Sequence, residues 1–195
     1  RFDGDEVRAI EHGSIHRVDT ERGLAEPSLT RFGGRFYLTI RHDLRGYVTR
    51  SDDGMHFEEL RTWTFDDGSE LGNYNTQQHW LTRDDALYLV YNRRSELNNG
   101  VVRSRAPLFI TQVDPQRLCV LRQAERIVLP EKGARMGNFN VINVSDEESW
   151  VMTGEWLQQY IPGYGPDQPY WIDGGDQYNR MQYIGDLLLA RVYFS

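Results

Sequence analysis

The sequence has few of the residues that mark a disulfide framework, a metal centre or a membrane span. Of its 195 residues one is a cysteine, Cys119, which excludes an internal disulfide. No run of about 18 apolar residues, the length that a membrane-spanning helix needs, is present. The five histidines show no His-x-His or His-Glu-x-x-His spacing. We therefore predict no cofactor, no metal centre and no membrane contact, and leave open a structural calcium ion on loop aspartates.

Basic residues are outnumbered, with 22 Lys and Arg against 29 Asp and Glu and a formal net charge of −7. A surface that binds nucleic acid must be basic to neutralise phosphates, so nucleic acid is not the expected partner. The single cysteine leaves the compartment open. No signal peptide is visible after Arg1. We favour a secreted or periplasmic location over a cytoplasmic one.

Aromatic residues are plentiful: 11 Tyr, 8 Phe and 5 Trp. Such residues favour strands over helices. With 39% apolar residues, the chain is long enough for one domain with a real core, or for part of a larger one. These proportions favour an all-β fold.

The stretch 26–57 has the pattern of an antiparallel unit. Residues 36–40 are apolar, aromatic and β-branched, and a turn at 33–35 leads into them from a partner strand. A second strand at 46–49 runs into the turn 51–57, in which an aspartate can accept backbone N–H bonds and a glycine can take a positive φ. Residues 1–25 alternate weakly and are interpreted as an edge strand and a connector.

The same unit recurs along the chain. Leu87-Tyr88-Leu89 aligns with Phe36-Tyr37-Leu38 at an offset of 51 residues, and Trp150-Val151-Met152 matches the same strand again. Repeats of this size, built from short strands, are typical of propeller blades. We predict blade units at roughly 20–60, 61–121 and 122–195.

Two motifs in the first unit resemble the sialidase (neuraminidase) superfamily of β-propellers. The turn 51–57 resembles a shortened Asp-box of the BNR repeat, and Glu26-Pro27-Ser28 followed by a Gly-rich turn, an apolar strand and Arg41 resembles a substrate-binding blade. The resemblance implies a six-bladed propeller, of which about 50 residues per blade would give this chain three to four four-stranded blades. An upstream segment, another chain or a second copy would then complete the ring, because an open arc exposes sheet edges.

The resemblance also implies a site for a carboxylated sugar. Sialidases hold the substrate carboxylate with three arginines, since planar guanidinium groups bind carboxylates bidentately. Arg41 matches the second arginine, and Arg105, with Arg103 as the alternative, matches the third. Glu26 matches the glutamate that activates a tyrosine nucleophile. That tyrosine has no counterpart in the third unit, where the sequence is Gly-Asn-Phe-Asn-Val at 137–141.

Other chemistry on the same scaffold therefore has to be considered. Glu26 and Glu155 are candidates for the paired carboxylates of a glycosidase. His79 is the candidate base of a lyase acting beside a uronate carboxylate. The remaining candidate ligand contacts are Gln78, Asn138 and Tyr74, with Trp80, Trp156, Tyr160 and Trp171 as aromatic platforms for a sugar.

Structural roles compete with these assignments. Glu26 and Arg41 could form an ion pair that only closes a hairpin end, and His79 could be a packing residue. The favoured function is a glycoside hydrolase of the sialidase superfamily acting on acidic glycans without the usual tyrosine. The alternatives are a polysaccharide lyase with a histidine base and a non-catalytic glycan-binding propeller.

Overall fold

The fold comes from a computed structural model, which describes residues 2–4, 6–7, 9–83, 85–99, 101–132, 134–156 and 186–194. At six of these positions only the backbone is described: 2, 3, 6, 7, 102 and 156. Residues 157–185, which include the aromatic candidates Tyr160 and Trp171, lie outside the described residues.

The chain is all-β, with antiparallel sheets. The first sheet has the order β3 (Ala25–Phe32), β4 (Arg35–Arg41), β5 (Tyr47–Ser51), β6 (Arg61–Thr62). The second contains β7 (His79–Thr82), β8 (Leu87–Tyr91), β9 (Leu108–Asp114), β10 (Cys119–Val120) and β11 (Arg126–Leu129), the last paired with β9. The third has the order β12 (Arg135–Asn143), β13 (Glu148–Trp156), β14 (Leu187–Tyr193).

Helical and terminal elements are small. The described helices are the 3₁₀ turns η1 (Glu96–Asn98), η2 (Val102–Ser104) and η3 (Arg122–Ala124). Near the N-terminus, β1 (Phe2–Asp3) pairs with β2 (Glu6–Val7). In the part of the chain that the structure describes, no helix has both the length and the apolar character to cross a membrane.

The three segments of the predicted repeat occupy equivalent strands. The segments at 36–38, 87–89 and 150–152 lie in β4, β8 and β13, each the second strand of its sheet. The second sheet runs past the limit of 121 predicted for its unit, because β11 pairs with β9 rather than with a strand of the third sheet.

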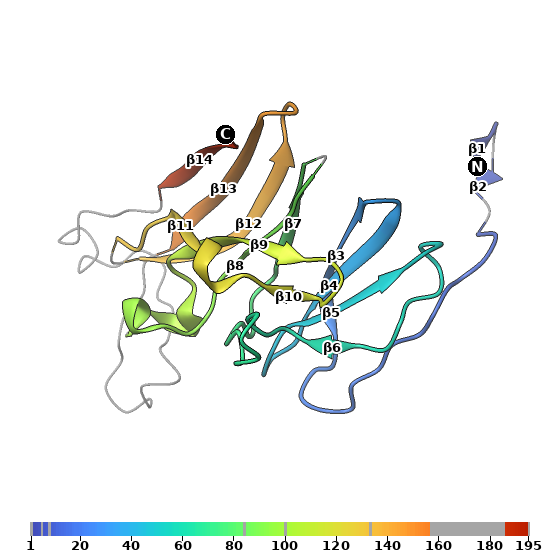
Figure 1. Cartoon of the computed structure of the whole chain (residues 1–195), viewed down its shortest axis with the longest axis horizontal. Coiled ribbons are helices and arrows are strands. Elements are labelled where there is room, and N and C mark those ends of the chain that lie inside the picture. The colour runs from blue at the N-terminus through green and yellow to red at the C-terminus, as the bar shows by residue number, and fades with distance from the viewer. Residues whose placement is uncertain are drawn as a thin grey trace.

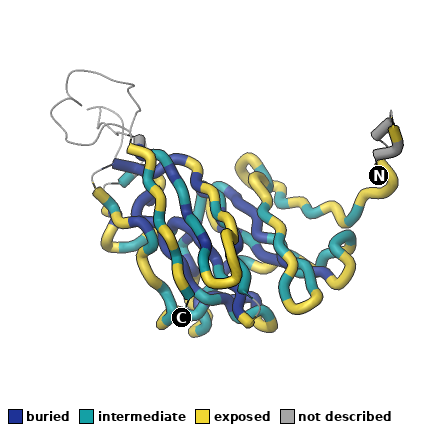
Figure 2. The backbone as a smooth tube through the Cα atoms, turned by 90° about the horizontal axis from the view of Figure 1, so that it is seen from above, coloured by how far each residue is buried: buried dark blue, intermediate teal, exposed yellow. Residues whose placement is uncertain are grey.

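The sheets pack face to face in series, with β7, the first strand of the second sheet, contacting β3 of the first sheet and β12 of the third (Figure 1). Large apolar side chains, among them Trp63, Trp80 and Leu89, fill the space between the first and second sheets. A second cluster around Leu108, Met136 and Val151 fills the space between the second and third. Figure 2 shows these buried segments in dark blue at the centre of the molecule.

A buried hydrogen-bond chain ties the first two sheets together. The Trp63 indole Nε1 donates to Thr39 Oγ1 at 3.0 Å, and Thr39 Oγ1 donates to Gln78 Oε1 at 3.1 Å. All three residues are at most 2% exposed. Satisfied polar groups of this kind fix how two packed surfaces register on each other.

The outer face of the third sheet is apolar and open. Strand alternation sends Ile142, Leu187, Leu189 and Tyr193 to this face, where they are 46–81% exposed. Their neighbours along the strands, such as Val151 and Leu188, face the second sheet instead. We call this surface, made of those four residues with Trp150 and Met152, the outer face.

The turn at 51–57 has the bonding that its sequence predicts. Asp53 Oδ1 accepts from Met55 N at 2.8 Å and from His56 N at 2.7 Å, and Gly54 has φ +79°. Among the described residues of 1–25, strand structure is confined to β1, β2 and the first residue of β3. Residues 9–24 instead run along the first sheet, held by Ser14 N donating to Met55 O at 2.8 Å.

Candidate functional site

Glu26 and Arg41 meet at the end of the first sheet where β3 begins and β4 ends. Arg41 Nη1 lies 2.7 Å from Glu26 Oε2, and the Arg41 side chain is 8% exposed while that of Glu26 is 36% exposed. A β-bulge between Ala25 and Ser28 and a φ of +45° at Glu26 interrupt the strand. Bulges re-aim side chains and are frequent beside active sites, so the backbone here turns Glu26 toward Arg41.

Arg41 makes a second contact with the loop that precedes β7. Its Nη2 donates to Asn75 Oδ1 at 2.6 Å, while its buried Nε has no hydrogen-bond partner. Asn75 holds a φ of +49° and also accepts from Arg22 Nη2 at 3.1 Å. One side-chain oxygen therefore joins two arginines from distant parts of the chain.

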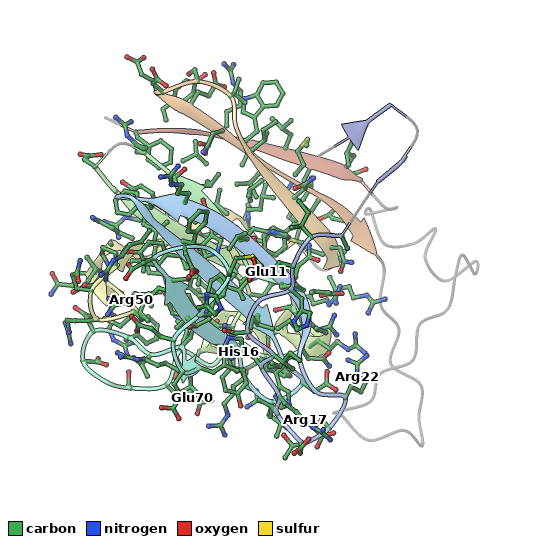
Figure 3. The ribbon with its side chains drawn as sticks, turned by 90° about the vertical axis from the view of Figure 1, so that its right-hand side faces the viewer. Glu11, His16, Arg17, Arg22, Arg50 and Glu70 are labelled. Atoms are coloured by element: carbon green, nitrogen blue, oxygen red, sulfur yellow. The ribbon has the colours of Figure 1, made fainter. Side chains whose placement is uncertain are left out.

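Arg22 comes from the N-terminal connector and is neutralised by Asp43. Its Nε donates to Asp43 Oδ2 at 2.7 Å. This hydrogen bond, together with the opposite charge, raises the pKa of Arg22 and lowers that of Asp43. Figure 3 shows Arg22 on the connector at the rim of the molecule.

Two further arginines come from the loop between β8 and β9. Arg103 and Ser104 are consecutive left-handed residues, with φ +55° and +49°. Arg105 follows them and is 8% exposed; its Nη1 makes a long hydrogen bond of 3.4 Å to Asn138 Oδ1, and its Nε is buried without a partner. Burial, reinforced by the charges of Arg103 and Arg41, lowers the pKa of Arg105 to about 10.

Arg135, at the start of β12, completes a group of arginines contributed by three sheets. It is 4% exposed, and burial together with the charges of Arg105 and Arg103 lowers its pKa to about 9. We call Arg41, Arg103, Arg105 and Arg135 the arginine group. Arg41, Arg105 and Arg135 are buried, and Arg103 is exposed. Like charges brought together repel one another, so an anion bound among them would be stabilised.

His79 lies beside this group on β7. Its Nδ1 is 3.3 Å from Ser28 Oγ, and its ring packs edge-on against Phe139 with centroids 5.0 Å apart. Burial lowers its pKa, against the opposing effect of the Glu26 charge, and its Nε2 has no hydrogen-bond partner. The lowered pKa favours the neutral imidazole of His79, which lies within electrostatic reach of Glu26.

A pocket of about 530 Å³ opens next to His79. Side chains from the β7 region and from β12, β13 and β14 surround it: Gln77, His79, Asn138, Phe139, Asn140, Met152, Thr153, Gly154 and Leu187. Asn138 is shared, since it lines the pocket and also accepts the Arg105 hydrogen bond. The pocket and the arginine group are thus neighbours.

Glu155 has a different set of charged neighbours. It is 3% exposed, and neither carboxylate oxygen has a hydrogen-bond partner among the residues that the structure describes. Burial raises its pKa, with Lys132 opposing and Asp186 and Glu131 reinforcing the effect. Glu26 is the carboxylate whose charge raises the pKa of both Arg105 and His79, and Glu155 does not act on either residue. The two candidate carboxylates therefore occupy separate environments.

The other predicted contacts differ in their access to a ligand. Gln78 is 1% exposed and its amide bonds Thr39 and Thr76, so it is a buried structural residue. Tyr74 packs under the Arg94 guanidinium at 3.9 Å and acts electrostatically on Arg103 at the rim of the group. Trp156 pairs through its backbone with Arg135, and its side chain lies outside the described residues. Trp80 is a core residue, 6% exposed.

Sequence reasoning missed Arg135 and Arg22. Arg135 could have been found, because a charged residue stands at the start of the first strand of the third repeat, as Glu26 does in the first. Arg22 offered no such signal, since only the folded path of the connector brings it to Asp43. Among the described residues, no group of three or more His, Cys, Asp and Glu is arranged to hold a metal ion.

The chain resembles known proteins only in structure, and at low sequence identity. No protein-family model matches the chain, and no curated protein matches it. Among solved structures, a xylan β-1,4-xylosidase from Bacillus halodurans is 12% identical with a TM-score of 0.48, covering 68% of this chain and 25% of its own. A glycoside hydrolase family 32 protein from Bifidobacterium adolescentis is 12% identical with a TM-score of 0.46. The match covers 69% of this chain and 26% of that protein. An N-acetylgalactosamine deacetylase from F. plautii is 11% identical with a TM-score of 0.45, covering 70% and 41%.

The chain therefore spans between a quarter and about two fifths of the length of these proteins. The all-β architecture with antiparallel sheets is observed directly in the chain. The six-bladed sialidase ring and the BNR repeat stay predictions.

Proposed function

We propose that this chain is part of a carbohydrate-active β-propeller that binds acidic, carboxylated glycans and cleaves them as a glycoside hydrolase. The observation that carries the proposal is the arginine group, which brings guanidinium groups from three sheets together. Burial, reinforced by the charges of neighbouring arginines, lowers the pKa of Arg105 and Arg135 within it. A bound carboxylate would remove this repulsion and accept the hydrogen bonds that the buried Nε atoms of Arg41 and Arg105 leave unmade.

Glu26 is the proposed reactive carboxylate. It is the carboxylate paired with the arginine group, and its side chain is exposed enough to touch a ligand. Hydrolysis adds water across the glycosidic C–O bond, which requires a carboxylate to take a proton from water or to attack the sugar carbon. Glu155, buried beside Lys132, is proposed to support the third sheet rather than to face the substrate.

A polysaccharide lyase is the second candidate, and the state of His79 favours it. A neutral imidazole with a free Nε2 can remove the proton next to a uronate carboxylate whose charge is neutralised by arginine. The C–O bond at the neighbouring carbon then breaks, which leaves an unsaturated uronate and a free hydroxyl. No water is consumed in that reaction.

The ring itself is part of the proposal. The part of the outer face away from the pocket, made by Ile142, Trp150, Leu189 and Tyr193, would pack against a further sheet. That sheet would be supplied by another segment, another chain or a second copy, as the first and second sheets pack on their neighbours. A secreted or periplasmic location, where polysaccharides are met, is consistent with this role.

A cleavage assay on a panel of acidic oligosaccharides tests the proposal. New reducing ends that vanish in Glu26→Gln, with no absorbance from an unsaturated uronate, support the hydrolase. Products with that absorbance that vanish in His79→Ala support the lyase. Glu58→Gln is the matched control, because Glu58 is also paired with an arginine, Arg50, but belongs to a surface loop. Binding without cleavage by any variant would leave a glycan-binding propeller.

A further inference from the structure

The pocket beside His79 differs in charge from the arginine group next to it. None of its nine lining residues is an Asp, Glu, Lys or Arg. Polar amides and an imidazole stand on one part of the wall, while Met152, Leu187 and Phe139 supply apolar surface. Pyranose rings present hydroxyls at their edges and C–H groups on their faces, and such walls match both.

Several polar groups of this pocket have hydrogen-bonding capacity left over. Gln77 donates through Nε2 to Phe139 O, and Asn140 accepts its bond from Val141 N, which leaves Gln77 Oε1 and Asn140 Nδ2 free among the described residues. Asn138 uses Oδ1 toward Arg105, so its Nδ2 is free as well. One acceptor and two donors around a small space suit the hydroxyls of an uncharged sugar.

Asn138 makes the two regions continuous. Its Oδ1 takes the Arg105 hydrogen bond at 3.4 Å while the residue lines the pocket. Only the Asn138 side chain therefore stands between Arg105 and the pocket. A ligand with an acid at one end and a neutral ring at the other would fit across it.

We propose that the pocket lined by Gln77, His79, Asn138 and Asn140 is a subsite for an uncharged sugar joined to the acidic sugar held by the arginine group. The preferred ligand is then a mixed acidic–neutral oligosaccharide rather than a polymer of acidic units. This inference rests on the proposed function, because it takes the arginine group as the acid-binding part.

A larger side chain at position 154 would fill the pocket. Gly154 lines the pocket in β13, its φ lies outside the left-handed region, and a Cβ added there meets nothing within 4 Å. Gly154→Leu thus places a side chain in the space proposed for the neutral sugar without displacing protein atoms. Ile142→Phe is the matched control, because it adds bulk on the same face, 52% exposed, outside the pocket lining.

The test measures the affinity of the whole chain, by calorimetry, for glucuronate and N-acetylneuraminate and for each acid linked to galactose. We expect at least one linked ligand to bind about tenfold more tightly than its free acid, a gain that hydrogen bonds in a second subsite supply. Gly154→Leu should abolish the gain and leave binding of the free acid unchanged, and Ile142→Phe should keep both.

Each other outcome overturns the inference. Free acids that bind without any gain from galactose refute the neutral subsite and leave the proposed function standing. A gain that survives Gly154→Leu refutes this location for it. If no acid binds and Arg105→Ala changes nothing, the arginine group is no acid site, and both proposals fall.

Discussion

The Glu26 carboxylate and the Arg41 guanidinium lie 2.7 Å apart across the end of the first sheet, on a strand that a bulge and a left-handed residue distort at that point. A hairpin can be closed by an ion pair without such distortion. The combination of an ion pair, a strained backbone and a second, uncharged partner for Arg41 on Asn75 points to a positioned site.

Arg105 should contribute more to binding of an acidic sugar than any surface arginine. Arg105→Ala is expected to weaken binding about 10- to 100-fold, the range for loss of a hydrogen bond between charged groups. Arg105→Lys should recover only part of the lost affinity, because an ammonium group cannot bind a carboxylate bidentately. Calorimetry measures the affinities, and Arg126→Ala, an exposed arginine bonded to backbone oxygens nearby, is the control. Equal affinities for Arg105→Ala and the control would contradict the assignment.

His79 should make the fold sensitive to mild acid. Its pKa is lowered in the folded state, so the unfolded chain binds more protons once the pH falls below about 6.5. The free energy of unfolding should therefore drop between pH 7.5 and 5.5 by more in the native protein than in His79→Gln. Urea unfolding at both pH values measures this difference. His12→Gln, at an exposed histidine, should keep the native pH response.

Glu155 should make the fold less stable as the pH rises, whereas His79 makes it less stable as the pH falls. The pKa of Glu155 is raised in the folded state, so its protonated form stabilises the fold below its unfolded value of about 4.5, and this contribution is lost as the pH rises through the folded value. Glu155→Gln should consequently raise the urea midpoint at pH 7.5 and change it little at pH 4. Glu59→Gln, an exposed residue, should shift neither. A midpoint that falls at pH 7.5 would show that the carboxylate has a stabilising partner.

Leu89 should be among the most costly core positions. It is fully buried between the first and second sheets, and Leu89→Ala leaves a cavity, which costs about 2–5 kcal/mol of unfolding free energy. Leu29→Ala, at a leucine 56% exposed on β3, should cost far less. Chemical denaturation of the two variants side by side checks the difference.

The outer face should drive association of the isolated chain. Leu189→Lys and Tyr193→Lys place charges among exposed apolar side chains and are expected to lower the average mass in sedimentation velocity. Leu97→Lys tests a leucine that is 61% exposed elsewhere, on η1, and should leave the mass as it is. A chain that is monomeric at every concentration would disprove self-association through this face.

Much of the fold follows from local pattern. Alternation and β-branched residues predict strands at 36–40 and 46–49, and the 51-residue repeat predicts the matching strands of the other sheets. The edge strand expected in residues 1–25 is limited, among the described residues, to β1, β2 and Ala25, because weak alternation is not enough to make a strand when the segment has no sheet edge to pair with.

Less of the site could be predicted. Glu26, Arg41 and Arg105 were predicted from the resemblance to the sialidase blade, but burial decides the role of Gln78, and burial gives Glu155 charged neighbours other than the arginine group. Both effects depend on contacts between residues far apart in the chain. A single sequence does not record such contacts.

The arginine group also makes a ligand search possible without any assumed reaction. Because its members come from three sheets, an anion that bridges them would hold together parts that separate on unfolding. Ligand at about 100 times its Kd adds about 2.7 kcal/mol to the unfolding free energy. A thermal-shift screen of acidic sugars would therefore rank true ligands by the rise in melting temperature, even in a chain whose chemistry needs further blades to proceed.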